Sequence, residues 1–325
     1  MKQSGKLTTK GKQMSNDIAI LNDTFDAGTD LAKMLGFSTG GGNEQASTLA
    51  ELKQLYKAVK GEMEHKGKKM TVETVAGGNY SLTTADGKTI YSDTVTVRIF
   101  MQRYQYQRFE KYAAPIEGKD GKMFRSVMAL SLNSGDLKDN YGGFNCGRPG
   151  GYIKDYDTLA GPLRDIVKNT KRVLLVFGYV TLDNPVDENG NTVEFAGATP
   201  FFMRIKNSRS YKNVEGVAKA LAKLNRLPIQ YNVRFTSDNV PLPNGELNHF
   251  VVAEPIAPVE LTAEDQQAVK DFLAWVEFNN SMILKLWAAV HEDDITEEQK
   301  ELLQSMIDIS NDTATTDYND DEIPF

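Results

Sequence analysis

The chain has 325 residues, of which 40% are hydrophobic, so it can bury a core in one large domain or two modest ones. Cys146 is the single cysteine, which excludes an intramolecular disulfide and is typical of a reducing compartment. No apolar run approaches the roughly 18 residues of a membrane helix, and the basic N-terminus lacks the apolar core of a secretory signal. We therefore expect a cytoplasmic protein with no membrane partner.

The net charge of −7 is unevenly distributed along the chain. Residues 292–325 hold twelve acidic residues and one lysine, which leaves residues 1–291 with a net charge of +4. A basic body joined to an acidic tail indicates a polyanionic partner for the body and a separate role for the tail.

The first part of the chain is predicted to be an arm followed by a helix and a small β-meander. Residues 1–46 are polar and end in a Gly-rich stretch, which predicts a flexible arm. Thr48 and Glu51 form a capping box, and apolar residues at helical spacing predict a helix as far as about Met63. Gly-Gly and Asp-Gly turns then mark a β-meander that completes the segment 47–93.

Residues 94–258 are predicted to form the main β domain. The insertion at 133–170 is Gly-rich and irregular, and Asn189-Gly190 marks a hairpin turn. One helix, at about 211–226, precedes the last two strands. Stretches rich in β-branched and aromatic residues predict strands at about 94–109, 122–132, 171–182, 194–207, 229–236 and 248–256.

A helical pair and a tail are predicted for the remainder of the chain. Residues 259–309 contain two helical patterns, at about 263–291 and 297–309. Residues 310–325 are predicted to be a disordered acidic tail.

This order of elements predicts a mainly β fold with α elaborations. Strands followed by one helix and two further strands fit an OB-fold-like Greek-key barrel, with the N-terminal helix and meander and the C-terminal helices as extensions. An α+β sandwich remains open, because hydrophobic periodicity alone does not distinguish the two.

The stretch from Arg98 to Tyr112 interleaves basic and aromatic residues. Side chains alternate between the two faces of a strand, so one face is expected to point toward a core and carry Val95, Val97, Ile99 and Met101. The other face is expected to carry Arg98, Phe100, Gln102, Tyr104 and Tyr106. Exposed rings on that face need a partner, and the stretches around Phe202 and Tyr231 and the Gly-rich loop at Phe144 have a similar composition.

A single-stranded nucleic acid is one such partner, since bases stack on rings for roughly 1–3 kcal/mol each while cations contact phosphates. Packing is the alternative, because strands favour aromatic residues in any case. The predicted contacts are Arg98, Phe100, Arg103, Tyr104, Tyr106, Arg108, Phe144, Arg148, Tyr152, Phe202, Arg204, Lys206, Arg209, Tyr231 and Arg234.

Motifs of catalysis are missing from the sequence. Three scattered histidines and one cysteine make no zinc motif, and the Gly-rich loop lacks the Gly-Lys-Ser/Thr of a phosphate-binding loop. We therefore expect no enzymatic activity, no cofactor and no metal. A nuclease that uses scattered carboxylates remains open.

The chain ends in an acidic run followed by Ile-Pro-Phe. This end resembles the C-terminal tip of bacterial single-stranded DNA-binding proteins, in which such residues dock onto DNA replication, recombination and repair proteins. Glu322 stands where that family more often has Asp, which keeps the charge. The residues that match are Asp320, Asp321, Glu322, Ile323, Pro324 and Phe325.

The body resembles a bacteriophage-encoded single-stranded DNA-binding protein, which implies non-sequence-specific binding in the cytoplasm of a host cell. The rival interpretations are a DNA-processing enzyme that carries the same tip, and a virion or scaffold protein with a solubilising tail. The oligomeric state is not indicated by the sequence.

Overall fold

The computed structural model describes residues 49–65, 68–116, 119–132, 135–151, 153–195 and 197–291, all within one compact unit, Leu49–Phe325. The predicted arm 1–46, the second C-terminal helix and the acidic tail with its tip lie outside the described residues, as does Tyr152.

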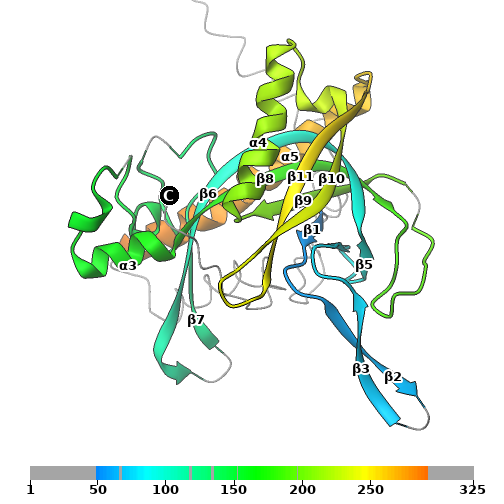
Figure 1. Ribbon diagram of the computed structural model, residues 1–325. Helices are drawn as coiled ribbons and strands as arrows, with labels where there is room; N and C mark the ends of the chain where they lie inside the picture. The colour runs from blue at the N-terminus through cyan, green and yellow to red at the C-terminus, as the bar shows by residue number, and fades with distance from the viewer. Residues whose placement is uncertain are drawn as a thin grey trace, which may run out of the picture. The chain divides into compact units, whose positions relative to one another are not determined.

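Most of the described chain is β-structure (Figure 1). Nine strands form one mixed sheet in the order β11-β10-β6-β8-β9-β1-β4-β5, with β7 paired to β6, while β2 and β3 form a separate hairpin. The strand order does not close on itself, so the sheet is not a closed barrel. The strands are β1 (Ala50–Gln54), β2 (Val59–His65), β3 (Lys68–Val75), β4 (Tyr80–Thr83), β5 (Thr89–Ser92), β6 (Thr94–Ile116), β7 (Lys119–Arg125), β8 (Thr170–Asp183), β9 (Thr199–Ile205), β10 (Tyr231–Pro241) and β11 (Leu247–Pro258).

Three α-helices lie within the described residues: α3 (Gly161–Asn169), α4 (Ser208–Lys223) and α5 (Ala263–His291). The prediction of a mainly β fold is therefore confirmed, as are the helices that correspond to α4 and α5. Helix α3 was missed, because it lies inside the insertion that was predicted to be irregular. None of the helices in the described part of the chain is long and apolar enough to cross a membrane.

The predicted helix from Thr48 to Met63 is wrong. Strands β1 and β2 occupy this stretch, and β1 pairs in parallel with β9. Ala50 and Leu52 are buried while Glu51 between them is partly exposed, which is the period of two expected of a strand. The spacing of the leucines in this stretch is compatible with a helix or a strand, and pairing with β9 favours the strand.

The predicted alternation along β6 is also wrong beyond Ile99. The register with β8 shifts between Ile99 and Met101, which places a β-bulge at Phe100. Gly178 lies opposite this bulge, where a Cβ atom would collide with the carbonyl oxygen of Arg98. Because the bulge adds one residue, Met101 points to the opposite face from Ile99 and joins Phe100 there.

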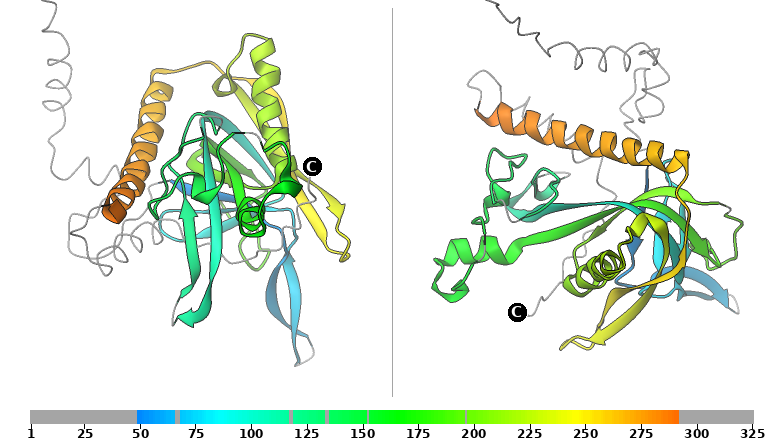
Figure 2. Two further views of the ribbon diagram at one scale, coloured as in Figure 1. Left: turned by 90° about the vertical axis from the view of Figure 1, so that its left-hand side faces the viewer. Right: turned by 90° about the horizontal axis from the view of Figure 1, so that it is seen from above.

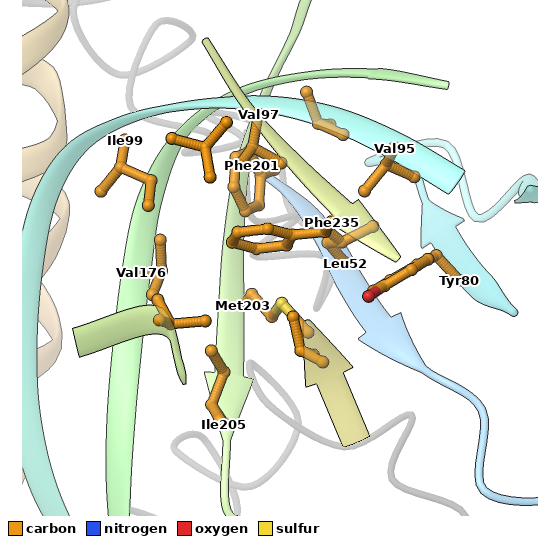
Figure 3. Packing of buried hydrophobic residues seen from close by; sticks show 14 of the residues in the cluster. Leu52, Tyr80, Val95, Val97, Ile99, Val176, Phe201, Met203, Ile205 and Phe235 are labelled. Atoms are coloured by element: carbon orange, nitrogen blue, oxygen red, sulfur yellow. The ribbon is translucent and has the colours of Figure 1, made fainter. Parts of the chain in front are cut away.

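The main core lies between one face of the sheet and α4. Figure 3 shows side chains that the strands contribute to it. Its strand members come from β1, β4, β5, β6, β8, β9, β10 and β11, and include Leu52, Val97, Phe201 and Phe235. Asn207 accepts hydrogen bonds from the first backbone N–H groups of α4, and the helix contributes buried valine and leucine side chains at helical spacing.

The opposite face of the sheet is covered by α5, as Figure 2 shows in the view from above. Phe272 and Trp275 of α5 pack against Phe177 and Phe202 of the sheet. Because both faces are covered, residues 173–177 of β8 are buried without a break.

Candidate nucleic-acid interface

The first two predicted contacts on β6 hold α5 in place. Arg98 donates to both carboxylate oxygens of Asp265, at 2.9 and 2.7 Å, and also to the carbonyl oxygen of Ile229. Burial raises the pKa of Asp265, but hydrogen bonds from Thr262 and Arg98 outweigh it and hold the pKa below its ordinary value. The ring of Phe100 packs edge-on against Phe272, with 5.8 Å between centroids.

Two further predicted rings are buried. Phe202 is 3% exposed and stacks on Trp275 at 5.1 Å, on the face that α5 covers. Tyr106 is 2% exposed and packs in a small cluster with Leu137 and Cys146. In this structure both rings contribute to packing, and neither presents a face on which a base could stack.

Arg108 and Arg204 are engaged in internal contacts. Arg108 donates to the carbonyl oxygen of Cys146 at 2.9 Å, and its guanidinium lies 3.9 Å from the centroid of the Phe124 ring. Arg204 forms an ion pair with Glu51 at 2.6 Å. These contacts join the loop at Cys146 to β6, and β1 to β9.

Lys206 follows β9 and is partly buried. Burial, together with Arg204 and Arg125, lowers its pKa to about 8. Its charge is therefore costly where it lies, and an anion bound nearby would raise the pKa again.

Four more predicted residues lie apart from one another along the sheet and α4. Arg103 is partly buried on β6 and donates to the carbonyl oxygen of Gln102, and burial lowers its pKa. Tyr231 packs against the main core. Arg209 and Arg234 are exposed, at the start of α4 and on β10.

One group of residues combines rings and cations, and we call it the tyrosine–arginine patch: Tyr104, Tyr106, Arg148, Arg172 and Tyr211. Tyr104 and Tyr106 are two residues apart on β6, and Arg172 of β8 lies opposite Tyr106 in the register. The rings of Tyr104 and Tyr211 have centroids 6.0 Å apart. The Arg148 guanidinium is 5.9 Å from the centroid of the buried Tyr106 ring, which forms the floor of the patch.

The two arginines of the patch have no counter-ion within the described part of the chain. Neither guanidinium forms a hydrogen bond or an ion pair there, and the Nε atom of Arg148 is buried without a partner. Burial, and then the charge of Arg172, lower the pKa of Arg148. The patch therefore holds a surplus of positive charge that an anion would stabilise.

The two tyrosines that border the arginines are half-buried and neutral at physiological pH. Burial, followed by the carboxylate of Glu215, raises the pKa of both Tyr104 and Tyr211. Tyr104 donates a hydrogen bond to Glu215 at 3.2 Å, which orients its ring. Neutral rings can stack on bases without repelling the neighbouring phosphates.

The surroundings of the patch are basic. Helix α4, which carries Tyr211, has four basic residues and one acidic residue, whereas α5 has four acidic and two basic residues. Figure 2 shows α3 and α4 on the side of the sheet opposite α5. The positive charge therefore lies on the same side as the patch.

The sequence alone identified three members of the patch, Tyr104, Tyr106 and Arg148. Arg172 and Tyr211 were missed, because only the pairing of β8 with β6 and the packing of α4 bring them there. Phe144, also predicted, is 48% exposed and lies beside Trp287 at the end of α5.

Comparison with protein-family models, with curated proteins and with solved structures gives no match for this chain. Within the described residues no group of His, Cys, Asp and Glu side chains is placed to hold a metal ion.

Proposed function

We propose that this chain binds single-stranded DNA without sequence specificity and protects it, with the strand lying across the tyrosine–arginine patch. The observation that carries the proposal is the patch itself: the half-buried rings of Tyr104 and Tyr211 lie together, and beside Tyr106 stand Arg148 and Arg172, which have no counter-ion among the described residues. Bases stack on tyrosine rings whatever their identity, and arginines contact the phosphates between them.

The strand order supports an OB-type arrangement for this function. Strands β6, β8 and β9 are followed by α4, and then by β10 beside β6 and β11 beside β10. Five strands with one helix before the last two make the Greek-key order of OB-folds, which bind oligonucleotides with loops that include the first connection. Here the first connection, between β6 and β8, carries Arg148. The parallel strand β1 pairs with β9 at the edge where a five-stranded barrel would close.

The acidic end of the chain supports the second half of the proposal. The tip, Asp320 to Phe325, recruits replication, recombination and repair proteins. Phe325 supplies apolar area for a pocket, Pro324 restricts the backbone, and the acidic residues speed the encounter with a basic partner.

A binding titration tests the DNA-binding half. Fluorescence anisotropy of a labelled oligonucleotide, single-stranded and then double-stranded, is measured from low to high salt. We expect tighter binding of the single strand, with an affinity that falls steeply as salt rises, because phosphate contacts release counterions. Equal affinity for duplex and single strand at every salt concentration would refute the proposal.

Deletion of Phe325 tests the recruiting half. The deletion removes no side-chain charge, so DNA affinity is expected to stay unchanged, while binding to a replication or repair protein that recognises such tips is expected to be lost. The matched control is a chain in which Thr315 is deleted, which shortens the tail equally and keeps the tip. Full partner binding by the Phe325 deletion would show that Ile-Pro-Phe has no such role.

A further inference from the structure

A second aromatic group lies where the insertion meets the C-terminal end of α5. We call it the Trp287 cluster: Lys138, Phe144, Trp287 and His291. The rings of Trp287 and His291 stack with centroids 4.2 Å apart, and the Lys138 ammonium lies 4.0 Å from the centroid of the Trp287 ring. The ring of Phe144 is 6.2 Å from that of Trp287 and is half exposed.

Packing of α5 leaves one polar atom of this cluster unsatisfied. The face of α5 that carries Met282, Ile283 and Leu286 packs against Val127, and the last turn of the helix, at Val290 and His291, packs against Gly142. The indole N–H of Trp287 is buried and has no hydrogen-bond partner within the described residues. Leaving a buried donor without a hydrogen-bond partner is unfavourable, so an acceptor brought by a ligand would stabilise the site.

The loop that carries Phe144 also carries Arg148 of the tyrosine–arginine patch. The two residues stand on either side of a short 3-10 turn, Asn145–Gly147. Asn145 donates to and accepts from the backbone of Leu137, and the Cys146 thiol donates to the carbonyl oxygen of Tyr106. This turn is therefore held firmly, and it carries the exposed ring of Phe144 at one end and Arg148 at the other.

Charge decides what kind of contact is made at the Trp287 cluster. Lys138 is its one lysine, and the ammonium group of this residue already lies over the Trp287 ring. The electrostatic attraction of a phosphate to the cluster is therefore weak, whereas stacking of a base on Phe144 depends on the ring alone.

We propose that a single strand bound at the tyrosine–arginine patch continues past Arg148 and stacks a base on Phe144, next to Trp287. This inference rests on the proposed function and extends it, because it adds a second stacking site and gives the direction in which the strand leaves the patch.

The tryptophans make the inference measurable. The chain has two, and the other one, Trp275, is enclosed by Phe177 and Phe202 under α5. In the variant Trp275→Phe, Trp287 is the sole source of tryptophan fluorescence. We expect saturable quenching of that fluorescence when a thymidine oligonucleotide is added, at the same concentrations that saturate anisotropy. The converse variant, Trp287→Phe, retains Trp275 and should show little quenching.

Phe144→Ala in the otherwise unchanged chain is the second test and does not depend on the folding of the tryptophan variants, because this ring is half exposed. We expect the affinity for a long oligonucleotide to fall about fivefold or more, the lower end of the range for one stacked base. The salt dependence should stay unchanged, since no phosphate contact is removed. The matched control is Leu284→Ala, an exposed apolar residue on α5 outside the cluster, which should bind normally.

The outcomes separate the inference from the proposed function. If the oligonucleotide binds while the fluorescence of Trp287 and the affinity of Phe144→Ala are both unchanged, the inference is wrong and the proposed function stands. If no oligonucleotide binds to the unaltered chain, the proposed function itself is wrong.

Discussion

The two faces of the large sheet carry aromatic residues in similar numbers, yet use them differently. On the α5 face, Phe177 and Phe202 are enclosed by Phe272 and Trp275, and Arg98 is neutralised by Asp265. On the α4 face, the tyrosines at the rim of the core are half-buried, and Arg148 and Arg172 have no counter-ion in the described part of the chain. Aromatic and basic composition alone therefore does not mark a binding surface. A binding surface differs from a packed one in two respects: its rings are not covered by a helix, and its cations form no ion pair with a carboxylate.

The largest expected effect is on the α5 face. Phe202→Ala should lower the free energy of unfolding by about 3–5 kcal/mol, because it leaves a cavity beneath Trp275. The folded fraction should bind single-stranded DNA with unchanged affinity. Urea denaturation and an oligonucleotide titration measure the two quantities. A folded variant that had lost DNA binding would place the strand on this face after all.

Removing a ring on the α4 face should mainly reduce DNA affinity, whereas removing Phe202 should mainly reduce stability. Tyr104→Ala should weaken binding by roughly 1–3 kcal/mol, the value of one stacked base. Tyr104→Phe is the matched control, since it keeps the ring and loses only the hydrogen bond to Glu215, and it should bind nearly as well as the unaltered chain. If the phenylalanine variant binds as weakly as the alanine variant, stacking is not what Tyr104 contributes.

Replacing the arginines of the patch should change the salt dependence of the affinity for single-stranded DNA. Arg148→Ala and Arg172→Ala should each reduce the slope of log affinity against log salt by about 0.7, as expected for one phosphate contact on a single strand. Arg234→Ala, which removes an exposed arginine from β10, serves as the control and should leave the slope unchanged. Equal slopes for all three variants would mean that the patch arginines contact no phosphate.

The smallest expected effect concerns pH and separates stability from binding. Burial lowers the pKa of His249, which lies against Gly77 and Gly78. Below about pH 6.5 the unfolded chain takes up a proton at this site more readily than the native one, so stability should fall as the pH falls through that range.

The variant His249→Gln should remove that part of the pH dependence in urea titrations between pH 8 and 5. DNA affinity should be flat over the same range, because burial raises the pKa of Tyr104 and Tyr211 further above it and both rings stay neutral. An unaltered pH dependence of stability in the variant would assign the effect to another group.

The sequence by itself determined the mainly β character, most strands of the sheet and helices α4 and α5, because each of these has a local hydrophobic period and local turn or capping signals. Thr262 illustrates this, since it stands immediately before the helical pattern predicted at about 263–291 and its hydroxyl accepts from the N–H of Asp265. The acidic tip is a sequence observation as well, and its role stays a prediction.

Tertiary structure decided the rest. The stretch that begins at β1 has apolar spacing that suits a helix, and pairing with β9 makes it a strand. The bulge at Phe100 reverses the faces of β6, and no local pattern announces it, because a bulge depends on the partner strand and here on Gly178. The same holds for the binding surface. Whether a ring such as Phe202 or Tyr104 is covered depends on where α5 lies, and residues far apart in the chain, Arg172 and Tyr211, join the patch only through packing of β8 and α4.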